Sequence, residues 1–487
     1  MHLLLDPIDR HASDRPAQPA AWDQSLALTF AQFRGLSCGL AGQIAAQTDR
    51  PRVGVLVPTS AAAAVSIYAC WYAGRAVVPL NFLLAPAELT RIVQDAGLDL
   101  VLTIDRFAPL VETAGARALV LAGNQTLVPA DLPTPRADER DIAAVIYTSG
   151  TAGEPKGVCL SVANLARNVA ASIAAVHMTP DDVFIGLIPQ FHAYGFTTTT
   201  LVPLSLGAAV YYLPRFSPLT AAEICRERRV SVLITIASMF GALLSTKSLA
   251  RADVPALRLA VSGGEPLPLP VARGFEQRFG VRLLEGYGMT EASPVVSLNT
   301  HEAYRLGSVG RPLDGISVTA CDAAGRAVAP GEEGELTIRG HGVMQGYLNK
   351  PEQTSRAIRD GALFTGDVGH VDADGFVFIT GRAKEMMIVG GENVYPSEIE
   401  RVLLQHPSIS EAAVIGTRDD IRGELPVAFV TLMPDAPPCD ENALRAFCRE
   451  HLAGYKVPRR VYIGGDLPRG PTGKILKRAL RAPAPDG

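Results

Sequence analysis

"IYTSGTAGEPKG" (residues 146–157) places glycines and small hydroxyl residues after an apolar run and ends with a proline and a lysine. A strand that feeds such a loop can direct several backbone N–H groups and hydroxyls at one anion. Lys156 adds a mobile point charge suited to phosphate oxygens. Because the GxxxxGK[ST] spacing of a Walker loop is absent, the stretch indicates either a phosphate-binding turn of another kind or an ordinary surface turn.

Around this loop, up to about residue 300, short apolar runs alternate with segments of helical periodicity. Val162, Leu165 and Val169, for example, are spaced by three and four residues, as on one face of a helix. Continuously apolar strands that alternate with helices predict an α/β fold with mostly parallel sheets. We predict buried strands at residues 53–58, 76–80, 98–103, 143–147, 230–235 and 257–263.

The sequence pattern changes after this region. Residues 306–380 contain glycine turns and short alternating strands, which predict a small antiparallel barrel or sheet. After Arg382 a second compact α+β unit begins, with a helix opened by Pro396, a helix near 440–453 and strands at 412–417 and 425–432. A unit of about 100 residues is a normal domain size.

The composition excludes several classes of protein. With 487 residues, 19% charged residues and a net charge of −4, the chain lacks the basic character of a nucleic-acid-binding protein. Its seven cysteines are scattered without metal-ligand spacing, so we expect reduced thiols and no zinc. The longest apolar run, 61–74, is shorter than the roughly 20 residues of a membrane span and predicts a buried helix. We expect a cytoplasmic protein, either monomer or homodimer, without a signal peptide.

Four further stretches carry polar groups among glycines: "EGYGMTEASP" (285–294), "FTGDVG" (364–369), "GRAKEMMIVGGENVYPSEIE" (381–400) and "PRGPTGKILKR" (468–478). Taken alone, each also fits a turn, a solvated carboxylate or a basic tail. In this order, with the loop at 146–157, the set resembles the adenylate-forming superfamily of acyl-CoA synthetases, luciferases and peptide-synthetase adenylation domains. The best match is the acyl-CoA synthetase branch, and the resemblance covers nearly the whole chain.

The resemblance implies a fold and a domain division. A large N-terminal domain (residues 1–382) would hold two α/β subdomains and a small β-barrel, and a small mobile α+β domain (383–487) would follow a hinge near Lys384. It also implies a reaction in which ATP and a carboxylic acid give an acyl-adenylate and pyrophosphate, after which a thiol takes the acyl group. Positive charge and alignment are needed because both reactants of the first step are anions.

The resemblance further assigns roles to residues. Thr290 would contact phosphate and Glu291 would bind Mg²⁺, while Lys474 would neutralise the reacting oxygens. Asp367 would bind the ribose hydroxyls and Arg382 ribose or phosphate. The β- and γ-phosphates would be held by Thr148, Ser149, Gly150, Thr151, Gly153 and Lys156. Adenine would lie between Gly264, Glu265, Pro266 and Tyr287, with Glu285 also counted as a cofactor-binding residue.

One position departs from the family pattern. Ala152 stands where Ser or Thr is usual, so one phosphate hydrogen bond should be missing, with an effect on ATP affinity. For the second step Lys474 must leave, so the C-terminal domain is expected to swing about Lys384. Gly391 matches the glycine that leaves room for the pantetheine of coenzyme A.

Two positions constrain the acid. His192 stands where amino-acid-activating relatives carry an aspartate for the ammonium group, so an amino acid is disfavoured; a buried structural histidine is the alternative. Gly288 replaces the tryptophan of acetate-specific relatives, which would leave depth for a chain or ring. The remaining walls would be Ala193, Phe196, Ser238, Met239, Gly263 and Met289, small or apolar as a hydrophobic acyl group requires.

We therefore expect a medium- or long-chain fatty-acid:CoA ligase that uses ATP, Mg²⁺ and coenzyme A. The alternatives are an aryl or arylpropenoic acid:CoA ligase and a ligase that loads a separate acyl carrier protein. A luciferase-like oxygenase would share the first step, without a separate signal in its favour. A non-catalytic nucleotide-binding scaffold is disfavoured because Lys156, Glu291, Asp367, Arg382 and Lys474 are all present.

Overall fold

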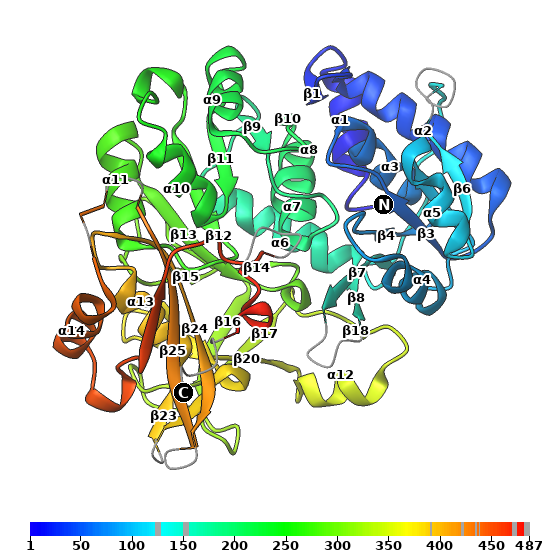
Figure 1. Ribbon diagram of the computed structural model, residues 1–487. Helices are drawn as coiled ribbons and strands as arrows, with labels where there is room; N and C mark the ends of the chain where they lie inside the picture. Colours follow the sequence, from blue (N-terminus) through cyan, green and yellow to red (C-terminus); the bar gives the residue numbers. More distant parts are fainter. Residues whose placement is uncertain are drawn as a thin grey trace.

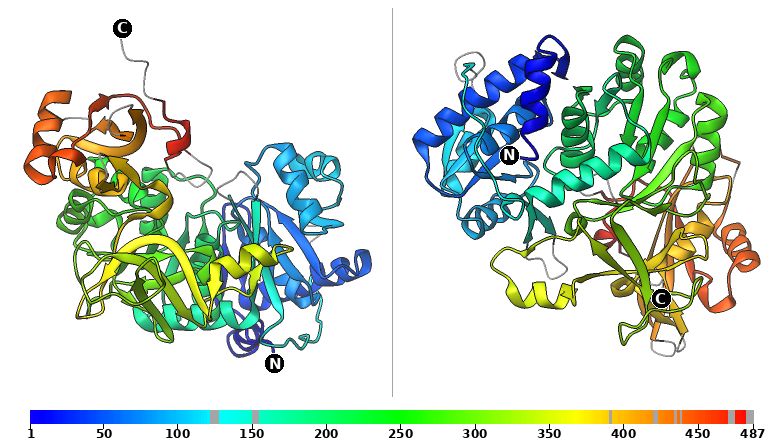
Figure 2. Two further views of the ribbon diagram at one scale, coloured as in Figure 1. Left: turned by 90° about the horizontal axis from the view of Figure 1, so that it is seen from below. Right: turned by 180° about the vertical axis from the view of Figure 1, so that it is seen from behind.

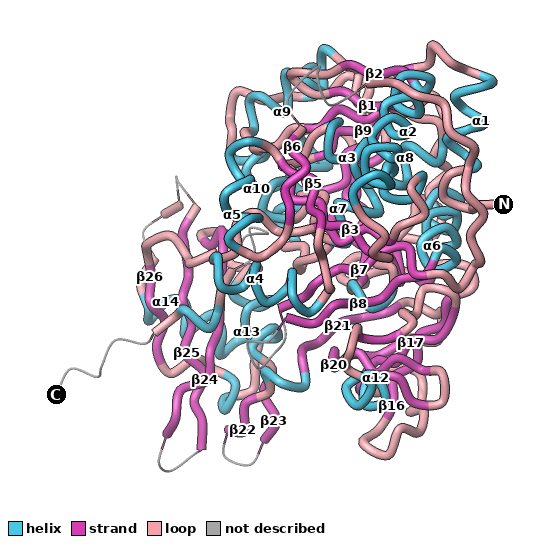
Figure 3. The backbone as a smooth tube through the Cα atoms, turned by 90° about the vertical axis from the view of Figure 1, so that its right-hand side faces the viewer, coloured by secondary structure: helices cyan, strands magenta, loops and turns pink. Residues whose placement is uncertain are grey.

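A computed structural model describes residues 1–121, 128–149, 155–389, 392–419, 423–433, 436–437, 439–469 and 475–481. Within these ranges the strands form two large sheets and a small sheet before residue 383, and one C-terminal sheet after it (Figures 1 and 3). None of the helices in this part of the chain combines the length and hydrophobicity that a membrane-crossing helix requires.

The first large sheet is parallel from β7 to β6 and antiparallel at the other edge, in the order β18–β8–β7–β4–β3–β5–β6. Its central strands are buried along their length, as expected of a parallel sheet with both faces covered. The strands are β3 (Arg52–Leu56), β4 (Ala76–Pro79), β5 (Leu100–Thr103), β6 (Arg117–Val120), β7 (Ile142–Ser149), β8 (Pro155–Ser161) and β18 (Gly346–Tyr347).

The second large sheet has the order β15–β14–β13–β12–β11–β9–β10–β1–β2. It is parallel from β1 to β13 and has antiparallel strands at both edges. The strands are β1 (Pro19–Trp22), β2 (Ala27–Thr29), β9 (Val183–Gly186), β10 (Ala209–Tyr212), β11 (Val232–Thr235), β12 (Leu259–Gly263), β13 (Leu283–Gly288), β14 (Val295–Leu298) and β15 (Arg311–Pro312).

Helices fill three layers around these sheets. The inner layer shares one hydrophobic core with both sheets and contains α1 (Asp6–Asp14), α2 (Phe30–Gln47), α3 (Ala61–Tyr72), α6 (Val162–Ala175), α7 (Ala193–Phe196), η3 (Thr197–Leu201) and α8 (Val202–Leu206). The outer face of the first sheet packs on α4 (Pro86–Asp95), η1 (Asp105–Phe107) and α5 (Ala108–Thr113). The outer face of the second packs on α9 (Pro218–Glu227), α10 (Ala237–Ser245) and α11 (Leu269–Phe279), and η4 (Arg251–Asp253) contacts α9. Seen from behind, α6 crosses the molecule between the two sheets (Figure 2).

Helix α3 confirms the prediction of a buried helix at 61–74. The Ser60 hydroxyl accepts a hydrogen bond from the Ala63 N–H (3.1 Å) and so caps the first turn. Every residue of α3 except Ala62 is buried, as expected of a helix that is apolar on all faces.

The small sheet is antiparallel throughout, as expected for residues 306–380. Inward and outward residues alternate along much of its first strand, which matches its alternating sequence. Its strands are β16 (Ile316–Cys321), β17 (Gly334–Gly340), β19 (Ile358–Arg359), β20 (Ala362–Val371) and β21 (Val377–Arg382), with α12 (Pro351–Ala357) preceding β19.

The C-terminal sheet has the order β23–β22–β25–β24, with β26 parallel to β25, and it has its own hydrophobic core. The unit contacts the small sheet where the Ser397 hydroxyl donates to the Thr380 carbonyl oxygen. The division at residue 382 and the hinge at Lys384 stay predictions. The elements are η6 (Ala383–Glu385), β22 (Met387–Val389), β23 (Glu392–Val394), α13 (Pro396–Leu403), β24 (Ile409–Asp419), β25 (Gly423–Leu432), α14 (Glu441–His451), η7 (Gly454–Lys456), β26 (Arg460–Ile463) and η8 (Lys477–Ala479).

Candidate active site

The residues expected at the phosphates come from two sheets. Thr148 and Lys156 face each other in register across the β7–β8 hairpin. Thr290 and Glu291 lie in η5 (Thr290–Ala292), the turn after β13, and η5 contacts β8. The fold therefore brings these four residues, which are far apart in sequence, to one place.

A tyrosine that the sequence did not single out lies between them. The Tyr347 hydroxyl donates to Glu291 Oε1 (2.9 Å), and Lys156 Nζ lies 4.9 Å from the centre of the Tyr347 ring. Burial, and then the charge of Lys384, lowers the pKa of Lys156, while Lys350 acts in the same direction and Glu291 opposes it. A polyanionic ligand would relieve this crowding of lysines. "QGYLNK" carries no motif that marks Tyr347, because only the pairing of β18 with β8 places it here.

Asp367, Arg382 and Tyr287 form a second group, at the expected ribose position. Asp367 Oδ2 accepts from the Tyr287 hydroxyl (2.6 Å) and Oδ1 from Arg382 Nε (2.9 Å). Asp367 is 3% exposed, whereas the Arg382 side chain is 65% exposed and faces open space. The charge of Asp367 raises the pKa of Arg382, and burial followed by that same charge raises the pKa of Tyr287. Tyr287 and Arg382 thus fix the orientation of the Asp367 carboxylate, and the Arg382 guanidinium lies on its solvent-exposed side.

The loop expected to hold adenine is fastened by two carboxylates. Glu265 Oε1 accepts from the Ser238 N–H at the start of α10, and Glu285 Oε1 accepts from the Leu267 N–H (3.0 Å). Burial raises the pKa of Glu285 to about 7. Gly264 has a φ of +82°, a conformation that favours glycine. In this structure Glu265 and Glu285 act as supports of the loop, and their contact with a nucleotide stays a prediction.

The expected acid pocket divides into a core part and an open part. Ala193 and Phe196 are buried, and the Phe196 ring packs edge-on against Trp71 at 6.1 Å between centroids. His192 Nδ1 accepts from the Tyr194 N–H (3.2 Å) and caps α7. Ser238, Met239 and Met289 are partly exposed and Gly288 is exposed, so these predicted wall residues border open space.

Two glycines of the predicted pocket have close neighbours. A Cβ on Gly263 would lie 2.9 Å from the Tyr194 hydroxyl oxygen, so this phenol fills the space beside Gly263. A Cβ on Gly288 would lie 2.1 Å from the Pro294 carbonyl oxygen, where β13 and β14 approach. The close approach of the two strands therefore explains why residue 288 is a glycine. The expectation based on pocket depth did not include this backbone contact.

Several predicted residues lie outside the described part of the chain. These are Gly150, Thr151, Gly153, Gly391 and Lys474, together with the variable position Ala152. Ser149 ends β7. The roles expected of all of them stay predictions.

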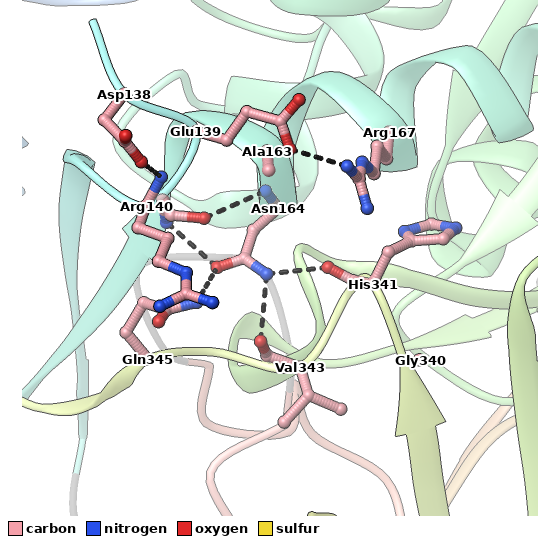
Figure 4. Close-up of a pocket in the computed structure, with 11 residues that line it drawn as sticks. Asp138, Glu139, Arg140, Ala163, Asn164, Arg167, Gly340, His341, Val343 and Gln345 are labelled. Atoms are coloured by element: carbon pink, nitrogen blue, oxygen red, sulfur yellow. Dashed lines mark hydrogen bonds and ion pairs between the residues drawn. The ribbon is translucent and has the colours of Figure 1, made fainter.

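A polar groove of about 620 Å³ lies beside the site, lined in part by Arg140, Asn164, Arg167 and His341 (Figure 4). Asn164 Nδ2 donates to the carbonyl oxygens of His341 (2.6 Å) and Val343 (2.9 Å). The same stretch of chain reaches Glu291, since the Met344 N–H donates to the Glu291 carbonyl oxygen (2.9 Å). The groove holds none of the predicted site residues.

The donor set fits a magnesium ion that is held mainly by a nucleotide. Within the described residues, no group of three or more His, Cys, Asp or Glu side chains is gathered for a metal. Mg²⁺ is commonly bound by one or two carboxylates together with substrate phosphates. The Glu291 carboxylate, with one oxygen engaged by Tyr347, meets that description beside Lys156.

Comparisons with known proteins identify the family of the chain. The family model described as AMP-binding enzyme matches residues 8–348, and the AMP-binding enzyme C-terminal domain matches 398–474. Feruloyl-CoA synthase of Amycolatopsis sp. is 34% identical over 97% of each chain. A long-chain-fatty-acid–CoA ligase of Bacillus subtilis is 33% identical over 88% of this chain and 85% of its own. The crystal structure of ATP-bound MatB from Rhodopseudomonas palustris is 31% identical, with a TM-score of 0.91 over 99% of this chain and 98% of that one.

These matches confirm the expected fold, a large N-terminal α/β domain followed by a small C-terminal one. They also confirm the expected enzyme class, an AMP-forming acid–CoA ligase, whose reaction uses ATP, Mg²⁺ and coenzyme A. The chain therefore belongs to the AMP-binding enzymes of the adenylate-forming superfamily.

Proposed function

We propose that this acid–CoA ligase activates an arylpropenoic acid, the alternative that the sequence ranked behind a medium- or long-chain fatty acid. Tyr194 carries the proposal. Its hydroxyl donates to the Thr235 carbonyl oxygen (3.2 Å) at the end of β11 and lies beside Gly263 at the end of β12. The phenol thus occupies space that a long acyl chain would need behind Gly263, and it leaves an aromatic wall suited to a flat acid.

The relatives support the same choice. Feruloyl-CoA synthase, whose name states an arylpropenoic acid, matches over nearly the full length of both chains. The long-chain-fatty-acid–CoA ligase of Bacillus subtilis keeps the fatty acid as second candidate. Met239 and Met289, flexible apolar side chains at the open part of the pocket, are compatible with that acid as well.

For the first step, we propose that Thr148 and Lys156 bind phosphate oxygens and that Glu291 binds the Mg²⁺ of the nucleotide. Asp367 would accept hydrogen bonds from the ribose hydroxyls, and Lys474 would neutralise the charge that develops between carboxylate and α-phosphate. Since the chain aligns over its length with an ATP-bound relative, we propose that the described arrangement is the one that binds ATP. The C-terminal domain would then swing for transfer to coenzyme A.

A panel of acids tests the proposal. Pyrophosphate release is measured with ferulate, cinnamate, octanoate, hexadecanoate and an amino acid, with and without coenzyme A. Ferulate or cinnamate should give a kcat/KM at least about tenfold above hexadecanoate, the size of effect expected when about 1.4 kcal/mol of transition-state binding is lost. A preference for hexadecanoate would instead favour the second candidate.

The variant Tyr194→Ala sharpens the test. Removing the phenol should open the space beside Gly263 and raise kcat/KM for octanoate or hexadecanoate while lowering that for ferulate. His192 and the rest of the site are unchanged in this variant. If chain-length preference stays as in the parent enzyme, Tyr194 does not bound the pocket.

A further inference from the structure

We propose that Tyr347 is a positioning residue for the metal-nucleotide complex: its hydroxyl orients Glu291 toward Mg²⁺, and its ring holds Lys156 toward phosphate. This inference rests on the proposed function, since it takes Glu291 as the metal-binding carboxylate. It adds a residue that neither the motifs nor the comparisons assign.

The Tyr347 side chain contacts two groups of opposite charge. The Tyr347 hydroxyl donates to Glu291 Oε1 at 2.9 Å. Lys156 Nζ lies 4.9 Å from the centre of the same ring, within the range of a cation–π interaction. The bond to Oε1 restricts rotation of the carboxylate, so that its second oxygen has a defined direction for a cation.

The backbone of Tyr347 is held from both sides. Its N–H donates to Thr354 Oγ1 (2.9 Å), and Tyr347 pairs with Val158 in the β18–β8 ladder. The neighbouring Leu348 N–H donates to the Gly157 carbonyl oxygen (2.7 Å), one residue beyond Lys156. The ring therefore lies on a strand, β18, that pairs directly with β8, the strand of Lys156.

The segment of chain that leads to Tyr347 is held at Asn164 and at the η5 turn. Asn164 donates to the carbonyl oxygens of His341 and Val343 (Figure 4). Ser293 Oγ donates to the Gly342 carbonyl oxygen (2.7 Å). The Met344 N–H bonds to the carbonyl oxygen of Glu291 itself (2.9 Å). The segment 341–347 thus spans from α6 to Glu291 and ends at the phenol.

Four variants separate the two contacts. Tyr347→Phe removes the hydroxyl and keeps the ring over Lys156, whereas Tyr347→Leu removes both. Glu291→Gln reports the metal-binding carboxylate on its own. Tyr72→Phe is the matched control, because the Tyr72 hydroxyl donates to the Asp9 carboxylate (2.7 Å) in α1, away from the site.

The first measurement is binding of Mn²⁺, followed by electron paramagnetic resonance, in the presence of α,β-methylene-ATP. The second is calorimetric binding of that nucleotide without metal. Tyr347→Phe should weaken Mn²⁺ binding about tenfold and leave metal-free nucleotide binding unchanged, since a hydrogen bond to a charged group is lost. Tyr347→Leu should in addition weaken metal-free nucleotide binding about threefold. Tyr72→Phe should match the parent enzyme in both measurements.

A double variant completes the test. Tyr347→Phe combined with Glu291→Gln should bind Mn²⁺ no more weakly than Glu291→Gln alone, because the hydroxyl acts through the carboxylate. Parent-like Mn²⁺ binding by Tyr347→Phe, alongside a loss in Glu291→Gln, would overturn this inference and leave the proposed function standing. Parent-like binding by Glu291→Gln would overturn the metal role of Glu291 and this inference with it.

Discussion

The Asp367 carboxylate shows at the scale of one residue how the protein prepares a ligand site. Both of its oxygens are engaged, one by Tyr287 and the other by Arg382, so the side chain has one orientation before a ligand arrives. A pre-oriented acceptor loses little conformational entropy when a ribose hydroxyl binds it. The same bonds also stabilise the fold, because a buried carboxylate is costly unless it is paired.

Asp367→Ala should therefore raise the KM for ATP at least about tenfold, the effect of losing one or two hydrogen bonds to a charged acceptor. The KM for the acid should change less, since the proposed acid pocket lies at Tyr194 and Met289. Steady-state kinetics with each substrate varied in turn will measure both values. An unchanged KM for ATP would remove Asp367 from the nucleotide site.

Glu285 gives a pH prediction at the same scale. Its pKa, raised to about 7 from an ordinary 4.5, means that the folded protein holds this proton more tightly than the unfolded chain. The resulting stability is full below pH 4.5 and is lost as the pH rises through 7, by about 3 kcal/mol. Glu285→Gln, which still accepts from Leu267, should be more stable than the parent at pH 8.5 and similar at pH 4.5. Urea unfolding at both pH values measures this, and equal differences at the two would contradict it.

At the scale of elements, the turn after β13 depends on how closely two strands approach. Gly288 pairs with Val295, and the Met289 N–H donates to the Pro294 carbonyl oxygen (3.0 Å), the same atom that a Cβ on Gly288 would meet. Thr290 and Glu291 follow at once. A side chain at 288 would therefore displace the residues that are predicted to bind phosphate and metal.

Gly288→Ala should lower the free energy of unfolding by about 2 kcal/mol, as overpacking does. It should also reduce adenylate formation with every acid in proportion, because η5 moves. Chemical unfolding and pyrophosphate release measure the two effects. A selective loss of large acids, with stability unchanged, would instead restore the interpretation of Gly288 as the floor of the acid pocket.

At the scale of the whole molecule, the C-terminal unit has contacts that must change if it swings. Ser397 of α13 bonds to Thr380 of β21 across the predicted domain division. Within the C-terminal unit, Lys477 bonds to Glu385 (2.8 Å) and Glu400 (2.9 Å). Lys477 lies three residues after Lys474 in the sequence. Its ion pair with Glu385 therefore joins this part of the chain to η6, which contains the predicted hinge residue Lys384.

A reducible cross-link between Thr380→Cys and Ser397→Cys should hold the described arrangement. Adenylate formation should persist within about twofold, while transfer to coenzyme A should fall at least about tenfold and recover on reduction. Rapid-quench measurement of the two half-reactions tests this, and the native cysteines, buried except for the partly exposed Cys439, limit side reactions. A cross-linked enzyme that still forms acyl-CoA at the full rate would contradict the swing.

Much of the architecture followed from local pattern. The buried strands at 53–58, 76–80 and 98–103 and the buried helix at 61–74 correspond to β3, β4, β5 and α3 within a few residues. Apolar runs of this kind are stable only when they are buried in a covered sheet or a helical layer. Their secondary structure therefore depends little on residues that are distant in sequence. The family motifs, which are spread over five stretches, were likewise identified from the sequence alone.

The positions that local pattern could not supply all depend on partners distant in sequence. Tyr347 meets Glu291 because β18 joins β8, Tyr194 reaches Gly263 across the ends of β11 and β12, and Glu285 supports a loop near residue 267. Such contacts arise when sheets and helices pack. The local sequence pattern does not show which strand ends come together. The order of residues alone thus determined the family, the fold and the chemistry of the reaction. The packing of distant strands decided which side chains contact the predicted site residues and how much space lies beside Gly263, because distance and direction in a site exist only in the folded chain.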